Sequence, residues 1–136
     1  MRLTTKTRYA LRAMVELAGQ RKDRPLPLKV ISKRQGIRPK YLEQLLRRLR
    51  LTGLVKSVKG PGGGYLLSRK PELISLLDIV KAVGESLTPV FCVAKNKRKR
   101  CPRYRWCPTR PSWKKLDHLI EKFFKDRTLL DLCRKR

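Results

Sequence analysis

The stretch from Gly36 to Leu67 constrains the fold more than any other segment of the chain. In its first half, leucines recur from Leu42 at the spacing i, i+3, i+4 and i+7, which predicts a helix with one buried face. In its second half, two short apolar runs flank the glycine-rich segment 60–64, which predicts a β-hairpin with a tight turn. A helix followed by a basic hairpin is typical of a winged helix-turn-helix, whose helix enters the major groove of DNA.

The other periodic segments predict a mainly α fold in which the hairpin supplies a two-stranded β wing. We expect helices at about 4–20, 28–35, 75–83 and 109–126, and a short helix after Thr128. Gly36 stands where a helix ends and a tight turn begins. The helix at 28–35, this turn and the leucine-bearing helix therefore form the predicted helix-turn-helix pair.

The chain carries 36 basic and 10 acidic residues, a net charge of +26, which implies a polyanionic partner. Nucleic acid is favoured over a membrane surface, because the basic residues lie within the folded pattern and not on one amphipathic tail. An RNA-binding or ribosomal role fits the composition equally well, and only the hairpin motif argues for DNA.

No run of 18 apolar residues exists, so we expect no membrane span and no membrane partner. The N-terminus lacks the apolar core of a signal peptide, so we expect a cytoplasmic protein. His118 is the single histidine, and no histidine–acid–nucleophile set is present. We therefore expect that the protein is not an enzyme.

A polar face of the central helix carries Lys40, Glu43, Gln44 and Arg47. Gln44 can make two hydrogen bonds to adenine, and Glu43 can accept one from the amino group of cytosine. An acid facing DNA lowers affinity, so Glu43 is expected to serve discrimination between sequences. The alternative is an ion pair with Arg47 one helical turn away. Phosphate contacts are expected from Arg47, Arg48 and Arg50.

The hairpin turn is surrounded by Lys56, Lys59 and Arg69. Its glycines allow the backbone to lie close to phosphates, and Lys59 stands where a cation can enter a minor groove. The segment lacks the lysine and the serine or threonine of a nucleotide-binding P-loop, which argues against a nucleotide site.

The last long helix has an apolar stripe with the spacing of a coiled coil, at Trp113, Leu116, Ile120 and Phe123. We interpret this stripe as the seam of a homodimer, and packing within one chain is the alternative. A two-fold dimer matches a palindromic operator whose half-sites lie about one helical turn apart.

Three cysteines, Cys92, Cys101 and Cys107, fall in one irregular loop, and Cys133 is expected to be a packing residue near the end. In a cytosolic protein, clustered cysteines more often bind metal or sense redox state than form disulfides. The intervening stretches of eight and five residues match no common zinc ribbon. A metal or iron–sulfur site is favoured, with redox-active thiols and ordinary buried cysteines as the alternatives.

Seven basic residues and no acid lie between the first and third of these cysteines. Such cations lower the pKa of a thiol and favour the thiolate that binds iron or zinc. They are Lys95, Lys97, Arg98, Lys99, Arg100, Arg103 and Arg105.

Several segments together resemble signatures of the bacterial iron–sulfur cluster regulator family, which includes IscR, NsrR and CymR. They are 1–6, 8–10, 34–37, 41–45, 53–55, 58–65, the three loop cysteines and 107–113. The resemblance implies a homodimeric winged-helix transcription factor whose [2Fe–2S] or [4Fe–4S] cluster alters its affinity for DNA. It implies base reading by Tyr41, Glu43 and Gln44, and wing contacts by Lys59, Pro61 and Gly62. Arg38, Lys40 and Arg47 complete the candidate DNA-binding set.

The chain departs from the family pattern at the wing and at the fourth cluster ligand. Lys59 stands where family members usually have arginine, which fits a narrow groove better. Arg110 and Arg8 stand where members have a histidine or an acid as fourth ligand, and a protonated arginine cannot bind iron. His118, Glu85, another residue, water or a thiol remain open as the fourth ligand.

The sequence therefore predicts three segments: a DNA-binding domain at 1–84, a cluster-binding loop at 85–108 and dimerisation helices at 109–136. The predicted function is a dimeric transcriptional regulator that senses iron–sulfur, redox or nitric-oxide state through cluster ligands Cys92, Cys101 and Cys107. The alternatives are a cluster-free regulator of the same family, controlled by thiols or a partner, and a basic protein that binds nucleic acid non-specifically.

Overall fold

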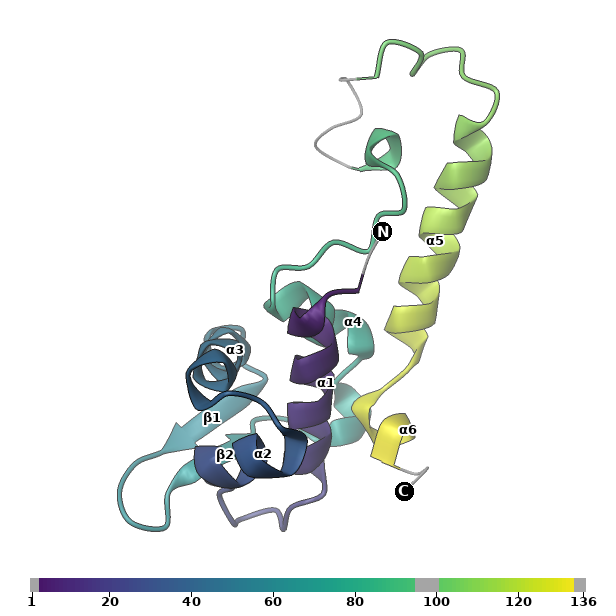
Figure 1. Cartoon of the computed structure of the whole chain (residues 1–136). Helices are drawn as coiled ribbons and strands as arrows, with labels where there is room; N and C mark the ends of the chain where they lie inside the picture. The colour runs from purple at the N-terminus through teal and green to yellow at the C-terminus, as the bar shows by residue number, and fades with distance from the viewer. Residues whose placement is uncertain (1–2, 95–100, 134–136) are drawn as a thin grey trace.

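The computed structural model describes residues 3–94 and 101–133, and it shows a winged-helix unit from which one long helix projects (Figure 1). The prediction of a mainly α fold with a two-stranded wing is confirmed. In chain order the elements are α1 (Thr5–Ala18), α2 (Leu28–Gln35), α3 (Pro39–Leu51), β1 (Val55–Val58), β2 (Gly64–Leu67), η1 (Pro71–Leu73), α4 (Leu76–Ala82), η2 (Phe91–Val93), α5 (Arg110–Asp126) and α6 (Leu129–Cys133).

The helix ends follow local signals in the sequence. Thr4 caps α1, because its hydroxyl accepts a hydrogen bond from the backbone N–H of Lys6. Gly36 follows α2 in the left-handed conformation, with φ of 64°, and Pro39 starts α3. Ser75 and Asp78 form a reciprocal capping box at the start of α4. These signals explain why the predicted bounds of the helices agree closely with the structure.

The wing is an antiparallel hairpin in which Val55 pairs with Leu67 and Val58 pairs with Gly64. Its turn is closed by a hydrogen bond of 2.9 Å from the N–H of Gly63 to the carbonyl oxygen of Gly60. Gly62 has φ of 76°, as the third residue of a type II turn requires.

The loop before α2 adds a further partner to the wing, which the sequence pattern did not predict. Leu26 and Tyr65 form an isolated antiparallel bridge, with two N–H to carbonyl hydrogen bonds of 2.9 Å. The wing is therefore attached to the helical unit at β2 as well as through its own chain connections.

One core joins α1, α3, the base of the wing and the end of the chain. All four leucines of the α3 stripe are at most 2% exposed, and α1 contributes Ala10, Ala13 and Met14 at 0%. Leu129 of α6 is also fully buried in this core. Burial of a leucine side chain contributes about 2 kcal/mol, so the stripe is a main source of stability.

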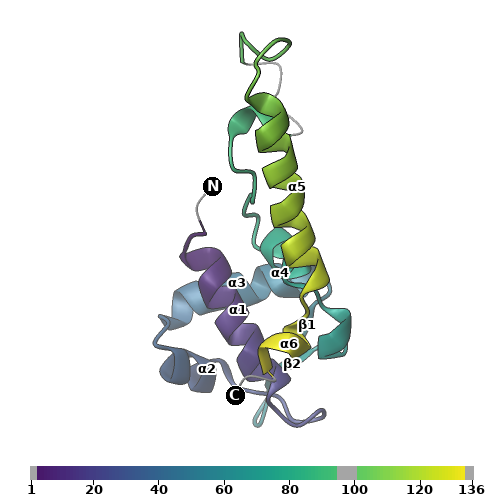
Figure 2. The same cartoon turned by 90° about the vertical axis from the view of Figure 1, so that its right-hand side faces the viewer.

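The base of α5 is fixed to the winged-helix unit, whereas the rest of the helix stands away from it (Figure 2). Phe124 packs in a second apolar cluster with Leu76, Leu77 and Val80 of α4. The N–H of Leu76 donates to the carbonyl of Arg127 at 2.9 Å, and the N–H of Leu129 donates to that of Ile74 at 2.8 Å. The connection between α5 and α6 is thereby held at the start of α4.

Candidate nucleic-acid interface and metal centre

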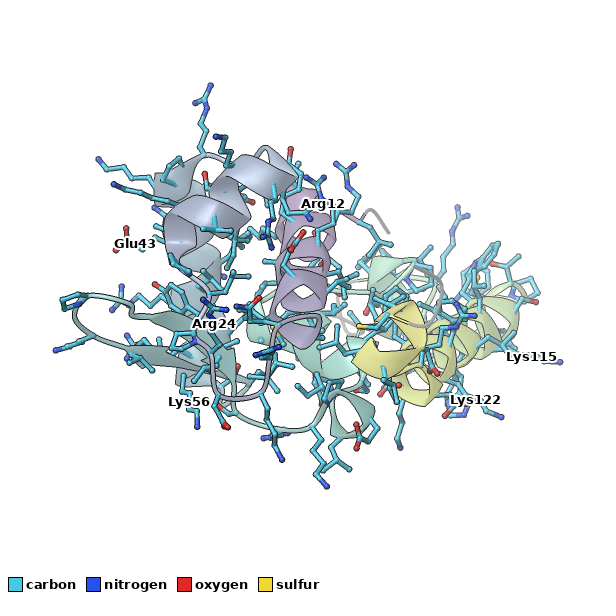
Figure 3. All side chains as sticks on the ribbon, turned by 90° about the horizontal axis from the view of Figure 1, so that it is seen from below. Arg12, Arg24, Glu43, Lys56, Lys115 and Lys122 are labelled. Atoms are coloured by element: carbon cyan, nitrogen blue, oxygen red, sulfur yellow. The ribbon has the colours of Figure 1, made fainter. Side chains whose placement is uncertain are left out.

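The polar face of α3 is free of the core and faces outward. Six of the predicted DNA-binding residues lie in the turn before α3 or on α3 itself. Five of them are exposed: Arg38, Lys40, Glu43, Gln44 and Arg47. Figure 3 shows Glu43 at the edge of the molecule on the side where the wing extends, while Lys115 and Lys122 lie at the far end on α5. The structure therefore brings the α3 face and the wing to one side.

The sixth residue, Tyr41, is half-buried against α1. Its ring meets that of Tyr9 edge-on, with centroids 6.0 Å apart. Its hydroxyl oxygen lies 3.2 Å from the hydroxyl oxygen of Thr5. These contacts hold Tyr41 at the edge of the polar face of α3.

Glu43 is exposed on α3, and its charge acts on the wing. Among the described residues, no ion pair joins Glu43 to Arg47, so the intrahelical alternative is not formed. Burial raises the pKa of Tyr65 on the wing, and the nearby charge of Glu43 raises it further, while that of Arg50 lowers it. The charge of Glu43 on α3 therefore acts on Tyr65 of the wing.

Arg48, expected as a phosphate contact, also makes a contact within the fold. Its guanidinium donates a hydrogen bond of 2.8 Å to the carbonyl oxygen of Val83, at the end of α4. Arg47 and Arg50 are exposed. Arg48 thus joins α3 to α4 within the fold.

The wing carries its three predicted contact residues, Lys59, Pro61 and Gly62, in exposed positions at its turn. Any Cβ added at Gly62 would meet no other atom within 4 Å, so the backbone there is open to a partner. Gly63 is different, because a Cβ there would lie 2.2 Å from the carbonyl oxygen of Val58.

The cysteine loop carries the candidate cluster ligands, Cys92 in η2 and then Cys101 and Cys107, all half-buried and free of disulfides. The stretch that holds five of the seven predicted cations, 95–100, lies outside the described residues. Within residues 3–94 and 101–133, no three histidine, cysteine or acidic side chains are close enough to hold a metal ion. The donor type fits an iron–sulfur cluster, but the thiols are not gathered into one site.

The thiol of Cys107 lies in surroundings that favour its thiolate. Its sulfur is 3.1 Å from the hydroxyl oxygen of Thr109, and this hydrogen bond is the main cause of its lowered pKa. The backbone of the same segment and the charge of Arg103 act in the same direction, while burial opposes them.

Arg110, at the fourth-ligand position of the family, lies on a hollow of about 600 Å³ between the loop and α5. Cys92 and His118 line the same hollow. The guanidinium of Arg110 stacks on the ring of Tyr104 at 4.0 Å, and its buried Nε has no hydrogen-bond partner among the described residues. A buried cationic N–H of this kind fits an anionic group and is no metal ligand.

Glu85, another candidate fourth ligand, is already engaged by α1. Its carboxylate accepts hydrogen bonds from the hydroxyls of Thr4 and Thr7, and from the N–H of Thr4 at 2.9 Å. Burial raises the pKa of Glu85, but these hydrogen bonds outweigh it and hold the pKa below its ordinary value. Sequence reasoning missed this contact, because it joins residues about eighty positions apart.

The apolar stripe predicted on the last helix is largely uncovered in the single chain. Trp113, Leu116, Leu119 and Phe123 are between 39% and 55% exposed. Ile120 is half-buried and packs at the edge of the second cluster. A monomer rarely leaves such a row of large apolar side chains in water, so the face is a candidate interface.

No helix in the described part of the chain is long and apolar enough to cross a membrane.

Comparison with known proteins gives consistent matches over nearly the whole chain. Residues 3–135 match the Rrf2 family, described as an iron-dependent transcriptional regulator. The chain is 45% identical over 132 residues to the HTH-type transcriptional regulator IscR of Yersinia pseudotuberculosis, covering 97% of this chain and 79% of that protein. The IscR of Erwinia tasmaniensis is 44% identical over 132 residues, with 97% and 78% covered.

Solved structures of similar proteins have the same fold. The global cysteine regulator CymR of Bacillus subtilis is 31% identical, with a TM-score of 0.82 over 100% of this chain and 98% of that chain. The IscR of T. potens is 36% identical, with a TM-score of 0.78 over 99% of this chain and 88% of that chain. The proteins named here are transcriptional regulators and not enzymes.

Proposed function

Since the chain belongs to the Rrf2 family of transcriptional regulators, we propose that it is a cytoplasmic, homodimeric regulator that binds a palindromic operator and senses iron–sulfur, redox or nitric-oxide state. The observation that carries this proposal is the exposed polar face of α3 beside an exposed basic wing. A DNA-binding regulator acts where the bacterial chromosome lies, which supports the cytoplasmic assignment.

In this proposal, α3 reads the major groove. Gln44 bonds adenine and Glu43 accepts from cytosine, with Tyr41 at the edge of the same face. Arg38, Lys40 and Arg47 bind phosphates and set the position of α3. Lys59, Pro61 and Gly62 bring the wing backbone and one cation to an adjacent minor groove.

The dimer forms through the exposed face of α5. A second copy packed on Trp113, Leu116, Leu119 and Phe123 would remove these side chains from water and extend the predicted coiled-coil seam. A two-fold axis through this seam presents two copies of α3 to two half-sites.

We assign cluster binding to Cys92, Cys101 and Cys107, with either nuclearity. A bound cluster would supply one-electron redox chemistry and reactivity toward nitric oxide. The chain's own part is to offer three thiols in basic surroundings, where Arg103 and the hydrogen bond of Thr109 favour the thiolate of Cys107. The loop must close to bring the thiols together, and that closure would shift α5 and with it the separation of the two α3 helices.

The cluster is tested by anaerobic purification with quantification of iron and sulfide. We expect a brown protein with visible absorption, and we expect Cys101→Ala to lose iron and to change how binding depends on the cluster. The matched control is Cys133→Ala on α6, which should keep the full iron content. A colourless wild-type protein without iron, or an unchanged Cys101→Ala variant, would contradict cluster binding.

A cluster-free regulator is the second candidate, favoured by two observations. The described residues gather no three metal donors, and the fold matches a cysteine regulator over the whole chain. In that case the thiols or a partner protein control DNA binding. Selection of bound sites from a random DNA pool, with and without iron, separates the two: only the cluster regulator changes its site preference or affinity with iron.

Sequence-specific binding is separated from general nucleic-acid binding by competition against random duplex at one stated salt concentration. A preference for the selected operator supports the proposal, and equal competition by random DNA would leave only a non-specific basic protein.

A further inference from the structure

One face of α1 is polar and turned away from the core, toward the helix-turn-helix. Thr5, Tyr9, Arg12 and Glu16 follow one another at intervals of four, three and four residues, so they form a single stripe along the helix. None of them takes part in the apolar core, apart from the ring of Tyr9 at its edge. Arg12 is labelled on α1 in Figure 3.

The lower part of this stripe holds the end of α2. The Nε of Arg12 donates to the side-chain oxygen of Gln35 at 2.9 Å, and its guanidinium also donates to the backbone carbonyl of Gln35. The side-chain amide of Gln35 donates to Glu16 at 2.5 Å. Arg34 forms an ion pair of 3.3 Å with the second carboxylate oxygen of Glu16. The side chain of Glu16 is only 8% exposed. The last two residues of α2 are therefore fixed to α1.

The upper part of the stripe holds the start of α3. Tyr41, in the first turn of α3, packs edge-on against Tyr9 and has its hydroxyl next to that of Thr5. The guanidinium of Arg12 lies 4.9 Å from the centre of the Tyr9 ring and so joins the two sets of contacts. One helix face thus holds both sides of the turn between α2 and α3.

Ile37 packs the turn into the core, but the other side of the turn is not closely packed against α1. A hollow of about 360 Å³ lies between them, lined by Thr5, Tyr9, Gly36, Arg38 and Tyr41. Arg38, which precedes α3, makes no side-chain capping hydrogen bond. The core fixes how α3 packs on α1, and the polar contacts of the stripe hold the open side of the turn and the start of α3.

We propose that Arg12, through Gln35 and Glu16, is a positioning residue that sets the orientation of α3 for base reading. Base contacts depend on geometry, whereas phosphate contacts tolerate small shifts because they rest on charge. Loss of the network therefore lowers affinity for the operator more than affinity for other DNA. This inference rests on the proposed reading of DNA by α3.

The test compares Arg12→Met with Lys6→Met, because Lys6 is an exposed cation on the same helix and each variant loses one charge. Binding of the full-length protein is measured by fluorescence anisotropy on the selected operator and on a scrambled duplex of equal length and salt. We expect Arg12→Met to lose about tenfold more operator affinity than Lys6→Met, the worth of one lost base contact. The two variants should bind scrambled duplex alike.

Two further variants keep the test decisive. Arg12→Lys keeps the charge but lacks the planar guanidinium whose two nitrogens bond the side-chain and backbone oxygens of Gln35, so it should remain defective in operator preference. Thr5→Val removes only a hydroxyl from the upper contact and should shift the preference in the same direction by a smaller factor, even where Arg12→Met fails to fold.

Equal losses on operator and scrambled duplex, or full preference in Arg12→Lys, would overturn the positioning role. A wild-type protein that binds operator and scrambled duplex equally would instead contradict the proposed function. The two failures are therefore distinguishable.

Discussion

At the scale of single residues, Glu43 is the one acid of α3, and it faces outward with no ion pair to Arg47. We expect Glu43→Ala to raise affinity for random duplex by a few-fold, because a negative charge leaves the DNA face. Its preference for cytosine-bearing operators should fall by about tenfold. Anisotropy on the operator and on single-base variants measures both. Unchanged discrimination would show that Glu43 reads no base.

The hydrogen bonds of Glu85 should make a pH-dependent contribution to the stability of the fold. The pKa of Glu85 is held below its ordinary value in the folded protein, so its hydrogen bonds to Thr4 and Thr7 stabilise the fold at neutral pH. This contribution should be lost as the pH falls from the ordinary glutamate pKa through the lowered one. Glu85→Gln should lose on the order of 1 kcal/mol at neutral pH and little in acid.

Thermal unfolding of wild type and Glu85→Gln at a series of pH values checks this prediction. The two melting curves should converge in acid. A constant difference between them at every pH would mean that the carboxylate charge contributes nothing.

The sequence predicted which site residues are exposed, because exposure follows from local position. It did not predict contacts between residues that lie far apart along the chain. Gln44 and Lys59 are exposed as expected, because helix periodicity and turn chemistry place them. Arg48 looked like its neighbour Arg47, and only the position of Val83, far along the chain, gives it a different partner. No pattern of spacing reports that contact.

At the scale of elements, the wing depends on glycine at two positions for different reasons. At Gly64 a Cβ would lie 2.4 Å from the carbonyl oxygen of Leu26, and φ is 152°. We expect Gly64→Ala to destabilise the protein by about 2 kcal/mol, because the bridge between Leu26 and Tyr65 must move. Gly62→Ala meets no neighbouring atom and is strained only by its φ of 76°, so it should cost less stability and also weaken DNA binding. Equal unfolding temperatures of the two variants would contradict this account.

The long helix α5 gives a prediction about assembly. Leu119→Glu places a charge in the middle of the exposed apolar face and should convert the dimer to a monomer. Affinity for a palindromic operator should fall by about a hundredfold, because the two reading heads then bind separately. Sedimentation and anisotropy measure the two effects. Lys122→Glu, on the same helix, serves as the charge control and should remain dimeric.

Element types and bounds were predictable, whereas some pairings between elements were not. Leucine spacing, capping residues and glycines mark the helices locally, so α2 and α5 begin and end close to where expected. The start of α6 was predicted from Thr128, but its bridge to Ser75 was not. Pairing across fifty residues depends on the folded core, and a single sequence does not encode it in any local pattern.

For the molecule as a whole, the net charge of +26 predicts that DNA affinity falls steeply with salt concentration. The steepness of this fall depends on how many subunits bind the DNA together. Three phosphate-contact candidates on each of two subunits should give about six contacts and a loss of about a thousandfold in affinity between about 50 and 200 mM salt. Arg47→Gln removes one contact per subunit. It should lower the slope of log affinity against log salt by about 2 in a dimer and by about 1 in a monomer.

Titration of wild type and Arg47→Gln at four or more salt concentrations measures the slope. An unchanged slope would show that Arg47 contacts no phosphate.

The attachment of α5 at only one end has a mechanical consequence. The helix is fixed beside α4 through Leu76 and Leu129, and its other end carries the cysteine loop about 25 Å away. A rotation of about 5° at the fixed end therefore displaces the far end by about 2 Å over this length. We therefore expect α5 to act as a lever arm in the proposed regulator: a shift of its far end by about 2 Å would tilt the winged-helix unit by about 5°.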